Sequence, residues 1–454
     1  MEPAQFAKAL QLGLGRAILW LQEHDAAPYR DAILECCLHN TAYDPQVEGI
    51  RVDYLLEVMA LTGDRPWFEQ RVLDALREPP GDAEPAYEVV WDIYQLCELA
   101  LEFARGGDEA ARVALYQRFE AHAQTGYDLG AIQIISLDGL QGFLHVAAKL
   151  GGHPNKHSFT GVLSPADVAA RKVGEEAFAT AIGEARRSDA TIAAYVDWAI
   201  GAALWPVSDR PSAPAVGATA EPKRVRTGGP LDSLTYAELR DGIVSGRSDF
   251  TYMNLRRWAK AAGTEALLAA ALGLESERDP DRLLCYLYIF TQRAYPLELS
   301  TILNLARHDQ TEVTWRAGQA LEMFEHPDVR QLALDYLTSP ERGSWAVDLL
   351  VRNYAVGDAP LIRQGLRAQR DQWHQHGFGI GVRQLFETHR EPELVPTLLD
   401  LYELGPCSFC RQHVLELLHE FGALPDWMLR EAVFDSYDET REWARALPHL
   451  PSSN

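Results

Sequence analysis

Apolar residues along this chain recur with the spacing of an α-helix, and the alternation of a β-strand is nearly absent. One segment places five of them on a single helical face: Val313, Ala317, Ala320, Leu321 and Phe324. These spacings line one face because an α-helix turns about once every 3.6 residues. The segment 329–337 repeats the pattern. The chain is therefore expected to bury one stripe of each helix against other helices.

Helix-start and helix-stop signals punctuate the chain at short intervals. Residues 164–167 (Ser-Pro-Ala-Asp) combine a capping serine, a first-turn proline and an acidic side chain. Asp309 and Glu312 form a similar, capping-box-like start, and Gly63 and Gly151 stand where a helix should stop. The connections between these signals are short, and short connections make consecutive helices antiparallel neighbours. The sequence thus predicts an all-α fold.

A similar helical unit recurs in the C-terminal half of the chain. Its copies align on one position near a helix start, occupied by Arg282, Arg316, Trp345, Arg383, Arg411 and Arg441. The copies lie about 30 residues apart, a period typical of helical-hairpin solenoids. No single hairpin can cover its own apolar face, so such hairpins stack and share a continuous core. We predict an all-α superhelical solenoid of antiparallel helix hairpins, irregular in the middle.

This pattern resembles the HEAT/armadillo-like family of helical repeats over residues 28–150 and 265–450. The resemblance rests on small or apolar positions in the second helix of each unit, a preceding Asp or Pro turn, and an Arg near that helix's start. It implies a concave surface lined by one set of helices. Residues 207–232 contain few bulky apolar side chains, so we expect an exposed, flexible linker there. The linker separates an N-terminal repeat half, 1–206, from a C-terminal HEAT-like half, 233–454.

The charge balance favours a protein partner. The chain has 65 acidic and 42 basic residues, a formal net charge of −23. A nucleic-acid surface needs many Lys or Arg to neutralise phosphates, so nucleic acid is not the expected partner. No apolar run approaches the roughly 20 residues that cross a bilayer, and the first residues lack the basic and apolar regions of a signal peptide. We expect a soluble cytoplasmic protein that does not bind membranes.

Cys407 and Cys410 form a Cys-x-x-Cys pair that is followed by His413. This spacing suits a zinc site or a redox-active thiol pair. No second cysteine pair completes a four-ligand set, and cysteines also pack into helical cores as small apolar side chains. We therefore expect no metal and no cofactor, and Cys407, Cys410 and His413 remain the candidate ligands if a metal is bound.

The chain contains no Walker A loop, no HExxH zinc motif and no GxSxG nucleophile elbow. We predict a non-enzymatic scaffold or adaptor that binds a protein or peptide on the concave surface. The alternative is a nucleic-acid-binding enzyme that resembles the alkylbase DNA glycosylases. That resemblance implies a basic concave surface with tryptophans and an acidic residue at the damaged base, and the segment 256–258 (Arg-Arg-Trp) would contact the phosphate backbone.

The candidate binding residues combine this segment with three arginines that recur near helix starts: Arg256, Arg257, Trp258, Arg316, Arg383 and Arg411. Two alternatives stay open for Arg316, Arg383 and Arg411. Each pairs with an Asp of the neighbouring repeat and forms a structural ladder, or several remain unpaired and form a positive stripe for an acidic peptide or phosphates.

Overall fold

The computed structural model describes residues 1–79, 86–153, 164–202 and 233–447. Within these ranges the secondary structure consists of α-helices and short 3-10 helices, without a strand. The prediction of an all-α fold is therefore confirmed. The predicted linker, 207–232, lies outside the described residues.

The chain divides into two compact units. Unit 1 contains Met1–Ala218 together with Asp426–Asn454, and unit 2 contains Thr219–Pro425. The segment 426–454 thus belongs with the N-terminal residues, whereas the repeat pattern predicts it as part of the C-terminal half, 233–454.

Unit 1 is built around α9, the longest of its helices, which contacts α7, α8, α10 and α12. Gly139 interrupts α9 with a φ of +59°, a conformation that glycine adopts without steric cost. The helices of unit 1 are α1 (Pro3–Gln11), α2 (Arg16–Glu23), η1 (Ala27–Tyr29), α3 (Arg30–Leu38), α4 (Pro45–Glu48), α5 (Val52–Leu61), α6 (Arg65–Arg77), α7 (Tyr87–Arg105), α8 (Glu109–Ala123), α9 (Ala131–Gly151), α10 (Pro165–Val173), α11 (Glu175–Ser188), α12 (Ala190–Gly201), α25 (Asp426–Ala432) and α26 (Asp438–Ala446).

Among the described helices, α9 alone is long and apolar enough to cross a membrane. More than half of its most apolar stretch is buried inside the protein. A core helix of a soluble protein passes the same test, so the length and composition of α9 are weak evidence for a membrane span.

Two glycines bring the C-terminal helices of unit 1 against its first helices. The backbone N–H of Ser436 donates to the carbonyl oxygen of Gly13 at 2.9 Å. Arg16 Nε donates to Glu431 Oε2, also at 2.9 Å. A Cβ atom on Gly15 would lie only 1.9 Å from the carbonyl oxygen of Glu431. The approach of α25 to the start of α2 therefore requires glycine at this position.

Replacing Gly15 by Ala is expected to destabilise unit 1 by about 1–3 kcal/mol, because the added methyl group must displace backbone atoms. Gly152→Ala is the matched control, since Gly152 has an ordinary φ and no atom within 4 Å of its Cβ position. Urea unfolding of both variants measures the difference. Equal midpoints for the two variants would show that the glycine contact does not limit the approach of α25.

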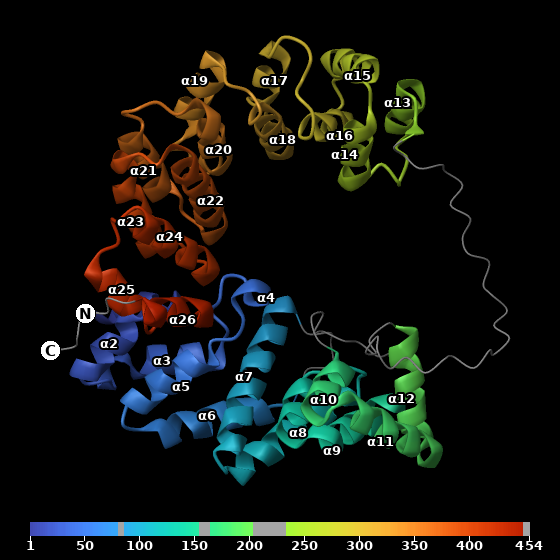
Figure 1. The fold of residues 1–454 in the computed structure, drawn as a ribbon, viewed down its shortest axis with the longest axis vertical. Coiled ribbons are helices and arrows are strands. Elements are labelled where there is room, and N and C mark those ends of the chain that lie inside the picture. Colours follow the sequence, from blue (N-terminus) through green and yellow to red (C-terminus); the bar gives the residue numbers. More distant parts are fainter. Residues whose placement is uncertain (80–85, 154–163, 203–232, 448–454) are drawn as a thin grey trace. The chain divides into compact units, whose positions relative to one another are not determined.

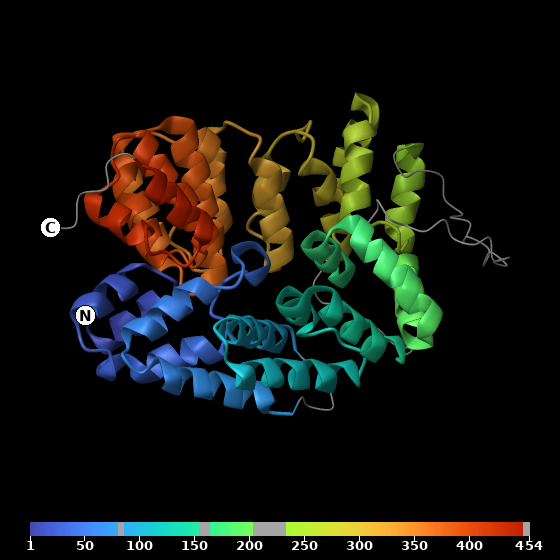
Figure 2. The same cartoon turned by 60° about the horizontal axis from the view of Figure 1, so that its bottom comes forward.

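Helices of unit 2 lie in two rows (Figure 1). In the first row, here called the α14–α24 row, the even-numbered helices α14 to α24 each contact the next. The second row includes the contacts of α13 with α15, α17 with α19 and α21 with α23. Figure 2 shows helices of unit 2 side by side along the stack. The helices of unit 2 are α13 (Tyr236–Ser245), α14 (Tyr252–Ala261), α15 (Thr264–Ser276), α16 (Pro280–Phe290), α17 (Ser300–Leu305), α18 (Thr311–Leu321), α19 (Pro327–Tyr336), α20 (Gly343–Asn353), α21 (Ala359–Ala368), α22 (Gln372–His389), η4 (Pro392–Leu394), α23 (Val395–Leu404) and α24 (Ser408–Glu420).

Arginine–aspartate pairs link successive helices of the second row. Arg330 of α19 pairs with Asp358, just before α21, at 2.5 Å. Arg363 and Arg367 of α21 both bind Asp400 of α23, at 2.7 and 2.6 Å. Burial raises the pKa of Asp400, but hydrogen bonds from the two guanidinium groups outweigh it and hold that pKa below its ordinary value. These pairs form an ion-pair ladder along the row.

Candidate functional site

A pocket of about 320 Å³ opens where three helices of the α14–α24 row begin. Its walls come from the starts of α18, α20 and α22 and from the turns before them. The lining residues are Asp309, Thr311, Glu312, Thr314, Trp315, Glu341, Arg342, Ser344, Trp345, Trp373 and His374. We call it the tryptophan pocket.

Three tryptophans give the pocket a buried side and an exposed rim. Trp345 is buried and packs against Gly318, where a Cβ atom would lie 2.6 Å from the indole ring. Trp315 is half-buried, and Trp373 is 69% exposed. An indole this exposed leaves a large apolar face in water, which is a usual property of binding surfaces.

Asp309 and Glu341, two exposed carboxylates of the pocket, form no ion pair within the described part of the chain. The expected capping box at Asp309 is wrong, because α18 begins at Thr311 with Gln310 as its N-cap residue. The Asp309 carboxylate is consequently not used as a helix cap. Glu312, in contrast, pairs with Arg316 of its own helix at 2.9 Å.

The other two charged or titratable side chains of the pocket are engaged locally. His374 Nδ1 lies 2.7 Å from the carboxylate of Asp371. The guanidinium group of Arg342 lies over the ring of Tyr336, 4.7 Å from its centroid. Tryptophan faces next to unpaired carboxylates attract cations, through the ring quadrupole and through charge. The pocket is therefore suited to a cationic group.

Aromatic side chains continue from the pocket along the α14–α24 row. The Arg316 guanidinium lies 4.1 Å from the ring centroid of Trp315 and 4.8 Å from that of Tyr288 on α16. Tyr288 in turn lies 5.9 Å from Tyr252, which is half-exposed at the start of α14. We call Tyr252, Tyr288, Trp315, Trp345 and Trp373 the aromatic stripe.

The three arginines that the sequence analysis singled out do not share one environment. Arg316 is held by Glu312 of its own helix, and not by an aspartate of the next repeat. Arg411 is buried. Nε and Nη1 of Arg383 are buried and have no hydrogen-bond partner among the described residues. Other arginines, on the second row, form the ladder described above.

The three residues of the segment 256–258 differ in their exposure to solvent. Arg256 and Arg257 are exposed on α14. Trp258 is buried, and its indole N–H donates to the carbonyl oxygen of Leu234 at 2.9 Å. Its ring belongs to the core of unit 2, which differs from the predicted role in binding.

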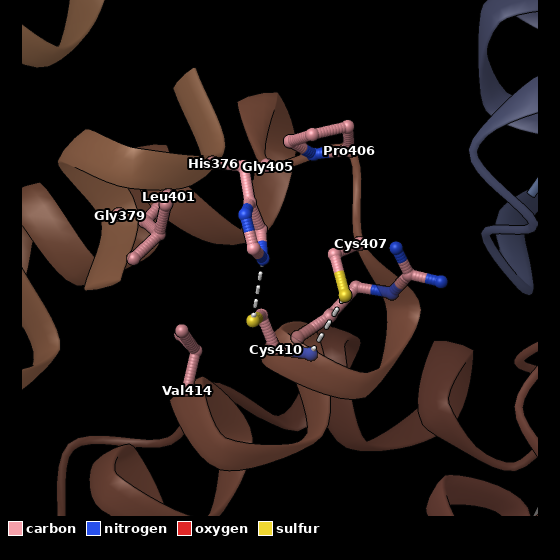
Figure 3. A pocket seen from close by; sticks show the side chains of 9 residues that line it. His376, Gly379, Leu401, Gly405, Pro406, Cys407, Cys410 and Val414 are labelled. Atoms are coloured by element: carbon pink, nitrogen blue, oxygen red, sulfur yellow. Dashed lines mark hydrogen bonds between the residues drawn. The ribbon is translucent and has the colours of Figure 1, made fainter. Parts of the chain in front are cut away.

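The cysteine pair gains a histidine from another helix. His413 Nδ1 lies 3.1 Å from the carbonyl oxygen of Phe409 in its own helix, so it is engaged away from the cysteines. His376 Nε2, from α22, instead lies 3.3 Å from Cys410 Sγ (Figure 3). Cys407 is buried and Cys410 half-buried. Proximity in sequence had favoured His413, although His376 belongs to a histidine-rich stretch, 374–389, that the sequence displays.

Two carboxyl groups have altered acidity inside unit 2. Burial raises the pKa of Glu322, at the end of α18, to about 7. Burial, and then the neighbouring Glu322, raise the pKa of Asp348 on α20 well above its usual range. Neither carboxyl lines the tryptophan pocket. Their protonation affects the stability of the helices that carry the pocket.

The stability of unit 2 is expected to fall as the pH rises from about 5 to about 8. The folded chain binds the Glu322 proton more tightly than the unfolded chain, whose glutamates titrate near 4.5. This contribution is complete below about pH 4.5 and is lost as the pH passes 7, with a size on the order of 1–3 kcal/mol. Glu322→Gln should flatten the dependence in urea unfolding, and Glu325→Gln, at an exposed position, should not. An unchanged pH slope in Glu322→Gln would contradict the assignment.

No family model matches the chain, and neither a curated protein nor a solved structure matches it. What the site binds must therefore be argued from its own residues.

Proposed function

We propose that the chain is a non-enzymatic scaffold that binds a segment of a protein partner along the aromatic stripe. In this proposal unit 2 is a HEAT-like solenoid, and the α14–α24 row lines its concave surface. The observation that carries the proposal is the tryptophan pocket at the starts of three neighbouring helices. An exposed indole and two carboxylates without an ion-pair partner among the described residues surround its cavity.

A lysine or arginine side chain of the partner is the group that fits this pocket best. Trp373 provides an exposed face for a cation–π contact, and Asp309 and Glu341 provide the opposite charge. A volume of about 320 Å³ is near the lower limit for small-molecule sites, and it is large enough to admit a long side chain. The net charge of −23 further favours a basic partner by attracting it at long range.

The length of the aromatic stripe supports a polypeptide as the ligand. Packed helices lie about 8–10 Å apart, and an extended chain advances about 3.3 Å per residue. The stripe from α14 to α22 therefore matches an extended segment of about 10–12 residues. Tyr252, Trp315 and Trp373 leave part of each ring exposed on three different helices, which suits a segment that contacts them in turn.

The second candidate is the glycosylase-like enzyme, and one observation favours it. Tryptophans and carboxylates meet in the same pocket, as the resemblance to alkylbase DNA glycosylases implies for the site of the damaged base. The exposed carboxylates at the pocket and the acidic chain oppose it, since both repel a phosphate backbone. A basic peptide, in contrast, is attracted by the same acidic residues.

Selection of random 12-residue peptides on the full chain is expected to enrich sequences with Lys or Arg flanked by apolar residues. Trp373→Ala should weaken binding of the selected peptides about tenfold, because an aromatic anchor is lost. Asp309→Asn combined with Glu341→Gln should weaken them and also reduce the dependence of affinity on salt. Fluorescence titration measures both effects.

Tyr87→Ala is the control, because Tyr87 is a similarly exposed aromatic residue on α7 of unit 1. Peptides that bind equally well to Trp373→Ala and to the unchanged chain would refute the proposal. Duplex DNA containing an alkylated base, bound or cleaved by the unchanged chain and not by Trp373→Ala, would favour the glycosylase-like alternative.

A further inference from the structure

A second cluster of reactive side chains lies at the start of α24 and shares no residue with the tryptophan pocket. It consists of His376, Cys407 and Cys410. The imidazole nitrogen and the two sulfur atoms all lie within 4.8 Å of one another. In Figure 3 the His376 ring points toward the sulfur of Cys410, and Cys407 lies on the adjacent turn. We propose that these three side chains bind one thiophilic transition-metal ion, Zn²⁺ by preference.

The separations suit the size of a zinc complex. Zinc binds thiolate sulfur at about 2.3 Å and imidazole nitrogen at about 2.0–2.1 Å, so the ligand atoms of a tetrahedral site lie about 3.5–3.8 Å apart. His376 Nε2 and Cys410 Sγ are already 3.3 Å apart, slightly closer than that. Small rotations of the three side chains are enough to surround an ion. Three protein ligands leave the fourth position to water or to an added ligand.

The site has room for one ion and little else. All three ligands line a cavity of about 10 Å³, about the space that one water molecule occupies. Leu401, Pro406 and Val414 also line it. An apolar wall excludes competing water and strengthens metal–ligand attraction in the low-dielectric interior.

Two features of the fold hold the ligands in place. Cys407 is the N-cap residue of α24, and its sulfur accepts the backbone N–H of Cys410 at 3.4 Å. Thiolates are favoured at a helix N-terminus, where the helix dipole is positive. On α22, Gly379 lies one turn after His376, and a Cβ atom there would lie 2.7 Å from Leu401 Cδ1. Glycine therefore lets α22 approach α23 closely enough to place the imidazole beside the cysteines.

The charges are compatible with a divalent ion. Binding displaces the two thiol protons into solvent, and Zn²⁺ with two thiolates is then neutral. Arg411, which also lines the cavity, consequently faces no net positive charge in the complex. Thiolate and imidazole donors together select Zn²⁺ or Cu⁺ over the oxygen-seeking ions Mg²⁺ and Ca²⁺.

Titration of the reduced, chelator-treated full chain with Zn²⁺ tests the proposal. We expect one equivalent to bind and to raise the melting temperature, and Co²⁺ in its place should give a sulfur-to-cobalt charge-transfer band. Cys410→Ser and His376→Gln should each lower the affinity for Zn²⁺ by roughly a hundredfold or more. Mutation of a residue that only hydrogen-bonds to a metal ligand already lowers metal affinity by about 10–100-fold. Circular dichroism of each variant checks that it is folded.

His413→Gln is the matched control, because His413 is a neighbour of Cys410 in sequence but bonds to its own helix. It should bind Zn²⁺ as tightly as the unchanged chain. Loss of binding in His413→Gln with retention in His376→Gln would overturn the ligand set. Absence of stoichiometric Zn²⁺ or Co²⁺ binding by the reduced chain would overturn the site. A Cys407–Cys410 disulfide found by mass spectrometry in the chain before reduction would then identify a redox pair.

Discussion

Close contact between neighbouring helices, at positions where only glycine fits, is the constraint on which unit 2 depends. Gly318 packs against the indole of Trp345, Gly379 packs against Leu401, and Gly381 packs against Asp348. A Cβ atom at each position would stand within 2.7 Å of its neighbour. The first contact positions the buried side of the tryptophan pocket, and the second positions the imidazole beside the cysteine pair. Both sites are consequences of how tightly the helices pack.

Charge is distributed unevenly in an otherwise acidic chain. On the second row, Arg330 pairs with Asp358, and Arg363 and Arg367 pair with Asp400. Each of these carboxylates therefore has a guanidinium partner. On the first row, Glu322 and Asp348 are half-buried and have raised pKa values, whereas Asp309 and Glu341 stay exposed and unpaired in the described part of the chain. The proposed binding of a basic segment depends on these exposed carboxylates.

Local sequence signals predicted where helices lie better than they predicted which side chains meet in the fold. The capping box at Ser164 and Asp167 is present, because both of its hydrogen bonds form within one helical turn. Asp309 and Glu312 form no such capping box, because α18 begins at Thr311 and Gln310 is its N-cap residue. Trp258 looked like a binding residue beside two arginines, but helical periodicity turns it inward while Arg256 and Arg257 face solvent. His413 was the candidate ligand by spacing, and a helix places His376 there instead.

The sequence alone determined that this protein is all-α, because periodicity and caps act over one or two turns and are legible without knowledge of distant residues. Only the tertiary structure decided which helices meet. The C-terminal helices join the first helices through Gly13 and Gly15, and the tryptophans of three helices meet in one pocket. Long-range contacts of this kind depend on the shape of both surfaces and on which glycines permit close approach, and neither is encoded in the spacing of residues along one segment.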